Sequence, residues 1–261
     1  MNHVLNFWKG IAKSRTVTSL VLTVSTVGVV LTTLSVSSAQ QVKRQGAPDK
    51  KPEQRLSTVE EAYPSPLTQA IVNQQIPLIY FLLSKGADPN GEDKTPQSGI
   101  PILVAASVGD VEILRVLLNA GARINSKDDS GLTALMITTL RGDTKTVAYL
   151  LQKGASVNAQ SDKGATALMT AARDEQVEII KLLLKAKADV NLAADGGVTA
   201  LMAAGDSLET VKALLAAGAK ADLADLHGWT AVCYAKANKQ LEKLATLLRT
   251  APHRSRECQP R

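Results

Sequence analysis

Residues that could ligate a metal or act as nucleophiles are few in this chain and far apart. The 261 residues include three histidines, His3, His227 and His253, which lack the spacing of a zinc site. Cys233 and Cys258 form no C-x-x-C pair. Ser-His-Asp catalysis would need a histidine in the folded region, where His227 alone qualifies. We therefore expect no enzyme, no cofactor and no metal, with an unrecognised hydrolase kept as a third alternative.

The remaining candidate groups have structural explanations. The chain contains no G-x-S-x-G, Walker or G-x-G-x-x-G motif, and the run from Asp195 to Gly197 is typical of a turn. Asp128 and Asp129 fall at a joint between repeated segments. A disulfide between Cys233 and Cys258 is left open, because Cys233 takes an inward position where a buried thiol is expected.

The elements that carry these residues repeat along the chain. The letters TALM begin at Thr133, Thr166 and Thr199, 33 residues apart, and a looser copy begins at Thr230. A second marker, GAxxN or a close variant, begins at the positions Gly86, Gly121, Gly154, Lys187 and Gly218, with steps of 35, 33, 33 and 31 residues. Two markers with one period indicate a repeat array.

Each unit is predicted to contain a turn, a short helix, a loop and a longer helix. The stretch 177–186 places Val177, Ile180, Leu183 and Leu184 on one face of a helix. Thr is suited to begin the short helix because its hydroxyl can accept a bond from an early backbone N–H. Gly after the longer helix is suited to a left-handed turn.

This pattern resembles the ankyrin repeat over about residues 63–250. The segments 130–159 and 163–192 match the family's turn-plus-TPLHLAA…GADVNA pattern most fully. The resemblance implies an all-α ankyrin-repeat solenoid of about six helix-turn-helix units with short β-turn fingers. The expected units span about 63–90, 91–125, 126–158, 159–191, 192–222 and 223–250. It also implies that the aspartate that begins a finger is structural.

Two departures from the family pattern carry their own expectations. The family's His is replaced by Met136, Met169 and Met202, so we expect Met packing there in place of Thr–His hydrogen bonds. Lys187 replaces the turn glycine, at a cost of about 1 kcal/mol if its φ is positive. We expect this strain to loosen the junction between the fourth and fifth units.

The resemblance implies a non-catalytic protein–protein interaction scaffold that binds through a concave groove. Trp229 is open to two interpretations, partner contact or a cap on the last repeat. Leu132 and Val198 predict a partly hydrophobic groove. The residues carried over from the family's variable finger and short-helix positions are Asp129, Ser130, Leu132, Leu140, Arg141, Asp162, Lys163, Arg173, Asp174, Asp195, Val198, Leu226, His227 and Trp229.

The ends of the chain have a different composition. Residues 1–39 contain Lys9, Lys13 and Arg15, then an uncharged run from Thr16 that closes on small residues at Ala39, as in a signal peptide. An uncleaved membrane anchor is the alternative, and both interpretations place the body outside the cytoplasm, periplasmic or secreted in a bacterium. Residues 40–62 are predicted to be a disordered linker and 251–261 a disordered basic tail.

Charge and composition restrict the partner. The net charge is +6, but residues 1–39 hold three of the 30 basic residues, which leaves 27 basic against 24 acidic residues. Such a balance is not typical of a nucleic-acid surface. We expect a monomer with an unknown protein partner, no nucleic acid, and membrane contact only through an uncleaved N-terminal segment. A membrane-anchored accessory or protective factor for a periplasmic enzyme is the alternative function.

Overall fold

The protein is a stack of helix pairs. The computed structural model describes residues 65–91, 99–204 and 207–237. The first helices of the pairs are α4 (Pro66–Val72), α6 (Pro101–Val108), α8 (Ala134–Leu140), α10 (Ala167–Arg173), α12 (Ala200–Ala203) and α14 (Ala231–Ala237). The second helices are α5 (Ile76–Ser84), α7 (Val111–Asn119), α9 (Thr144–Gln152), α11 (Val177–Lys185) and α13 (Leu208–Ala216).

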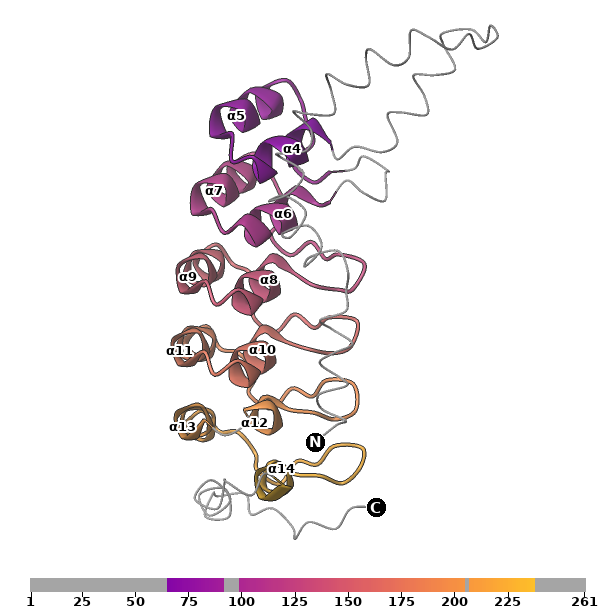
Figure 1. Ribbon diagram of the computed structural model, residues 1–261, viewed down its shortest axis with the longest axis vertical. Coiled ribbons are helices and arrows are strands. Elements are labelled where there is room, and N and C mark those ends of the chain that lie inside the picture. The colour runs from indigo at the N-terminus through magenta and orange to yellow at the C-terminus, as the bar shows by residue number, and fades with distance from the viewer. Residues whose placement is uncertain (1–64, 92–98, 205–206, 238–261) are drawn as a thin grey trace, which may run out of the picture.

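The helices form two layers that run the length of the molecule. In Figure 1 the second helices form the left layer, the first helices form the next layer, and the turns before the first helices project to the right. First helices contact first helices of the neighbouring pairs, and second helices contact second helices. In the described ranges, β-type pairing is limited to two isolated antiparallel bridges, Ala193–Thr199 and Ala224–Thr230. This arrangement confirms the expected all-α solenoid.

Short polar side chains begin many of the helices. Thr133 Oγ1 accepts a bond from the N–H of Met136 at 3.4 Å, and Thr166 Oγ1 accepts one from Met169 at 3.2 Å. At the second helices, the carboxylate of Asp143 and the hydroxyl of Ser207 do the same. These bonds satisfy backbone donors that a helix leaves unpaired at its start. The third TALM copy differs, because Thr199 Oγ1 is buried without a hydrogen-bond partner.

Left-handed turns end the second helices. Gly86, Gly121, Gly154 and Gly218 have φ between 86° and 94°, and Lys187 at the same place has φ 67°. The strained conformation expected of Lys187 is therefore confirmed. Its turn nevertheless keeps the backbone bonds of the glycine turns, Lys187 N–H to Leu184 O and Ala188 N–H to Leu183 O, both 3.0 Å. The geometry shows strain at Lys187, and the loosened junction between the fourth and fifth units stays a prediction.

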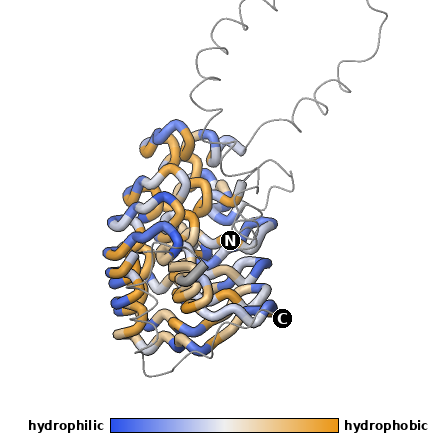
Figure 2. Tube along the Cα trace, turned by 60° about the horizontal axis from the view of Figure 1, so that its bottom comes forward, coloured by the Kyte–Doolittle hydropathy of each residue, from blue (hydrophilic) through white to orange (hydrophobic). Residues whose placement is uncertain are grey.

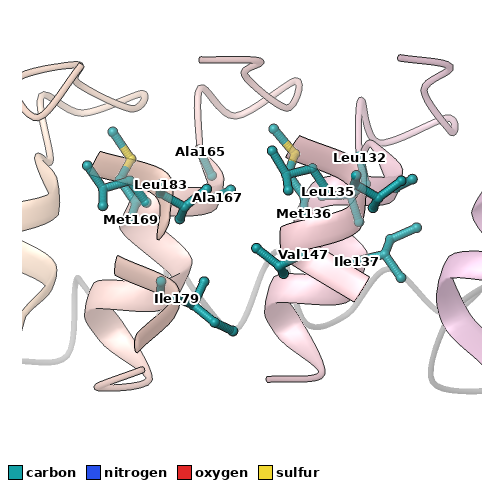
Figure 3. Close-up of a cluster of buried hydrophobic side chains, with 14 of the residues drawn as sticks. Leu132, Leu135, Met136, Ile137, Val147, Ala165, Ala167, Met169, Ile179 and Leu183 are labelled. Atoms are coloured by element: carbon teal, nitrogen blue, oxygen red, sulfur yellow. The ribbon is translucent and has the colours of Figure 1, made fainter. Parts of the chain in front are cut away.

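The TALM residues form the core between pairs. In all three copies the Ala, Leu and Met are at most 5% exposed, and Figure 3 shows Leu135, Met136, Ala167 and Met169 within one buried cluster. Small Ala residues let the first helices approach closely, and Met fills the position where the family has His. Figure 2 shows hydrophobic residues recurring along the whole stack, interrupted by hydrophilic turns. The expected packing of Met136, Met169 and Met202 is confirmed.

Several predicted segments lie outside the described residues. These are the export segment 1–39, the linker 40–62, the end of the last unit after residue 237, and the tail 251–261. Among the described residues, no helix has both the length and the apolar character needed to span a membrane.

Candidate functional site

The turns before the first helices, which we call fingers, are closed by their own backbone. The finger 128–132 has a bond from Asp128 N–H to Leu132 O at 3.1 Å, and the finger 225–229 has one from Asp225 N–H to Trp229 O at 2.9 Å. The carboxylate of Asp128 also accepts bonds from the N–H groups of Ser130 and Leu132. The structural role expected of this aspartate is confirmed. Asp225 forms the same pair of bonds in the last finger.

Adjacent fingers are joined directly through their backbones. Asp162 N–H donates to Ser130 O at 3.0 Å, Asp195 N–H to Lys163 O at 3.0 Å, and Leu226 N–H to Gly196 O at 2.8 Å. A Cβ added to Gly131 would lie 2.6 Å from Asp162 N, so glycine is needed for this approach. The four fingers therefore form one continuous ridge, which holds the side chains at the tips at fixed relative positions.

Side chains at the tips of the fingers are exposed. Asp129, Asp162, Asp195 and Leu226 occupy the same position in successive fingers, and Leu226 is 79% exposed. The ridge therefore carries a row of carboxylates that ends in an apolar side chain. Three other predicted contact residues flank this row, the exposed Lys163 and His227 and the partly exposed Ser130.

The predicted short-helix residues lie at the ends of α8 and α10. Leu140 is 37% exposed, and the Arg141 guanidinium donates to Val108 O of the preceding pair at 3.3 Å. The Arg173 guanidinium forms two bonds with the Asp174 carboxylate, from Nε at 2.6 Å and from the terminal nitrogen at 2.7 Å. All four side chains are at least partly exposed, but the pairing of Arg173 with Asp174 neutralises the charge of both.

Leu132 and Val198 do not line a groove, contrary to our expectation. They are 5% and 6% exposed, and Figure 3 places Leu132 within the buried cluster with Leu135 and Met136. Ala165, at the same place in its finger, is also buried. The last residue of a finger precedes the Thr that begins the first helix, and its side chain packs into the core under that helix. These positions support the fold, and a partner cannot reach them.

Trp229 occupies the same position in the last finger and is partly exposed. Its ring packs against Tyr234 with a centroid distance of 5.3 Å. The Tyr234 hydroxyl donates to Asp225 Oδ2 at 2.6 Å. Burial raises the pKa of Tyr234 well above its ordinary value, and the bond to Asp225 adds to this effect, so the hydroxyl stays a donor. The contacts of Trp229 favour the capping interpretation over a free contact residue.

A comparison with protein families agrees with this geometry. Residues 102–194, from α6 through the turn after α11, match the family model described as Ankyrin repeats (3 copies). The fold is an ankyrin-repeat solenoid. No curated protein matches the chain. The helix pairs on either side of the matched residues, α4 with α5 and α12 with α13, continue the same stack (Figure 1). Ankyrin repeats point to a protein–protein interaction scaffold.

The described part of the ankyrin array shows no arrangement suited to metal binding. No group of three or more His, Cys, Asp or Glu side chains comes together there. Cys233 is 5% exposed, as expected for its inward position, and its Sγ lies 3.3 Å from Thr230 Oγ1. Cys233 is disulfide-bonded, while Cys258, the other cysteine of the chain, lies outside the described residues.

Sequence reasoning missed how the ankyrin units are linked through the loops that follow the second helices. The asparagine that ends each GAxxN marker accepts a bond from a backbone N–H of the next unit, at 2.8 Å in all four cases. The donors are Arg123, Ser156, Asp189 and Lys220, bonded to Asn90, Asn125, Asn158 and Asn191 respectively. The signal is present in the sequence, because an asparagine recurs at the same place in four successive markers.

Proposed function

We propose that this protein binds another protein through the ridge of fingers and the adjoining ends of α8 and α10. The observation that carries the proposal is the direct backbone bonding between fingers. It fixes the backbone at every tip, while the exposed side chain changes from Asp129, Asp162 and Asp195 to Leu226. A rigid frame with variable exposed residues suits recognition, because little conformational entropy is lost on binding.

The residues proposed to make contact are those left exposed after Leu132 and Val198 are assigned to the core. The acidic tips Asp129, Asp162 and Asp195 favour a partner whose surface has basic side chains opposite this row. Leu226 supplies an apolar end to the same ridge. We propose that a partner contacts both, with apolar burial at Leu226 and complementary charge along the tips.

We propose that binding takes place outside the cytoplasm, in the periplasm of a bacterium or after secretion. The support is the order of features in residues 1–39: positive charge, an uncharged run of 24 residues from Thr16, and a close on Ser37-Ser38-Ala39. N-terminal sequencing of the exported protein tests this. A start at Gln40 supports cleavage, whereas a retained Met1 supports the alternative of a membrane-anchored accessory factor, and a body found in the cytoplasm contradicts export.

Site-specific photocrosslinking tests the binding surface. A photoreactive amino acid placed at Asp162 or at Leu226 should give an adduct with the same partner protein. Lys181 on α11 and Lys212 on α13 are matched controls, because both are exposed on the second helices, the layer away from the fingers (Figure 1). Equal capture of that partner at the two lysines would contradict the proposed surface.

A further inference from the structure

The second helix of the first pair, α5, exposes a side chain at a position that the second helices of the later pairs bury. Leu78, at the third position of α5, is 40% exposed, whereas Ile113, Thr146, Ile179 and Thr210 at the third position of the later helices are at most 1% exposed. Each later helix has a second helix before it in the stack, and α5 has none among the described residues (Figure 1). The side chain of Leu78 therefore faces the place where a preceding neighbour would pack.

Two further side chains of α5 are exposed. Phe81 is 55% exposed, whereas Val116 at the same position of α7 is 3% exposed and the residues at that position of α9, α11 and α13 are partly exposed. Tyr80 is 57% exposed, at a position that Arg115, Lys181 and Lys212 occupy in three later second helices. The helix Ile76–Ser84 contains no charged residue. We call Leu78 and Phe81, which are three residues apart and lie on one side of the helix, the α5 face.

An uncovered α5 face would leave the end of the array without a polar cap, which solenoid ends need for solubility. We propose that residues 56–63 of this same chain dock on the α5 face as a short amphipathic helix and cap the array. The cap would take the place of a preceding second helix and cover Leu78 and Phe81, as the later units bury the residues equivalent to Leu78.

This proposal replaces the prediction of a disordered linker for the end of the segment 40–62, because the sequence of residues 56–63 suits the role of a cap. Leu56, Val59, Ala62 and Tyr63 are spaced i, i+3, i+6 and i+7, which places them on one side of a helix. Residues 40–55 have no comparable apolar stripe.

The place where this segment joins the array favours it over other occupants. Residues 56–63 are separated only by Pro64 from Ser65, which caps α4, and α4 packs against α5. A segment tethered so close has an effective concentration in the millimolar range. Docking a separate molecule would first have to offset the entropy of association.

The size of the α5 face also argues against a second copy. Leu78 and Phe81, each about half exposed, offer on the order of 200 Å² of apolar surface, given the area of large apolar side chains. A stable dimer usually buries about 800 Å² on each partner. The face is therefore small for a dimer and fits a helix of two turns.

Photocrosslinking within the purified full chain tests the cap. With a photoreactive phenylalanine analogue in place of Phe81, we expect an intramolecular adduct with residues 56–63, mapped by mass spectrometry. The same analogue at Lys181, an exposed position of α11, is the matched control and should give no adduct with that segment. The second substitution Val59→Asp should remove the Phe81 adduct, whereas Thr58→Asp, off the apolar stripe, should keep it.

Other outcomes would overturn the cap. An adduct at position 81 that joins two chains would show that a second copy covers the α5 face. No adduct with residues 56–63, or an adduct that survives Val59→Asp, would show that the segment does not dock there. Because the binding test uses Asp162 and Leu226, at fingers of later units, its failure and the failure of the cap are distinguishable.

Discussion

The side-chain oxygen of Asn125 accepts a hydrogen bond from the backbone N–H of Ser156, 2.8 Å away in the next ankyrin unit. The same bond joins three further pairs of units, from Asn90 to Asn191. The fingers add backbone bonds between units, such as the bond from Asp162 N–H to Ser130 O. Both kinds of bond are present between the units 126–158 and 159–191 and between 159–191 and 192–222, in addition to the packing of Ala, Leu and Met.

Removing the amide of Asn125 should weaken one interface. We expect Asn125→Ala to lower the free energy of unfolding by about 1 kcal/mol, because the Ser156 N–H loses its acceptor at a partly solvated site. Asn125→Asp keeps an acceptor oxygen and should retain most of that stability. Urea denaturation followed by circular dichroism measures both variants. Equal losses for Ala and Asp would mean that the acceptor does not stabilise the interface.

Substitution of two glycines with similar φ can distinguish the cost of backbone strain from the cost of steric overlap with the next finger. Gly154 has φ 86° with no atom within 4 Å of an added Cβ, whereas at Gly164, with φ 71°, the Cβ would lie 2.9 Å from backbone atoms of Ala194 and Asp195. We expect Gly154→Ala to cost about 1 kcal/mol from backbone strain. Gly164→Ala should cost about 2–4 kcal/mol, because overpacking adds to the strain. Chemical denaturation compares them, and equal costs would contradict direct packing between fingers.

Relieving the strain at Lys187 should stabilise the protein. Lys187 has φ 67° at the position where the other units have Gly, and its turn keeps the same backbone bonds. We expect Lys187→Gly to raise the free energy of unfolding by about 0.5–1 kcal/mol. Lys187→Ala, which removes the charge but keeps a Cβ, is the control and should give no such gain. A gain with Ala as large as with Gly would assign the effect to the lysine side chain instead.

The last finger supplies a further test through the Tyr234 hydroxyl. Its bond to Asp225 at 2.6 Å lies beside the Trp229 ring. We expect Tyr234→Phe to lower stability by about 1.5–2 kcal/mol, because a bond to a charged acceptor is lost. Hydrogen exchange should then rise in residues 225–235 and stay unchanged at α8. Unchanged exchange in the last finger would show that this bond does not hold Trp229 in place.

The repeat period, the turns that end the helices and the buried core residues could be predicted, because each depends on residues close together in the sequence. A Leu-rich amphipathic stripe followed by Gly identifies the end of a helix whatever its surroundings are. Lys187 was identified as strained because its neighbours fix its place in the turn. Thr199 shows the limit of such rules, since it has the same sequence context as Thr133 and Thr166 and begins α12, but its side chain forms no capping hydrogen bond.

Exposure at the site was less predictable because it depends on what lies next to each unit. Leu132 is the last residue of a finger, where the variable positions of the family suggest an exposed side chain, but it packs under α8. Leu78 shows the opposite case. The residues at the same position of the later second helices are buried, and Leu78 is exposed because it lies at the end of the stack. Neither result follows from the residue type or the period alone.

The contrast between Leu132 and Leu226 gives a test that separates folding from binding. Leu132→Ala should lower the free energy of unfolding by about 2–4 kcal/mol, because it leaves a cavity in the core. Leu226→Ala removes a side chain that is 79% exposed, so stability should stay within about 0.5 kcal/mol. If Leu226 contacts the partner, its substitution should weaken binding by roughly tenfold, as expected for an apolar contact worth about 1.4 kcal/mol.

Binding of the partner captured at Asp162 should be measured by calorimetry at a temperature where both variants remain folded. Under these conditions we expect Leu132→Ala to bind with nearly the affinity of the unchanged protein, because the partner does not touch that side chain. Leu208→Ala is a matched control, since Leu208 is 41% exposed on α13, in the layer away from the fingers. Loss of affinity at Leu208 with none at Leu226 would place the partner on the second helices, and would remove the finger ridge as the binding surface.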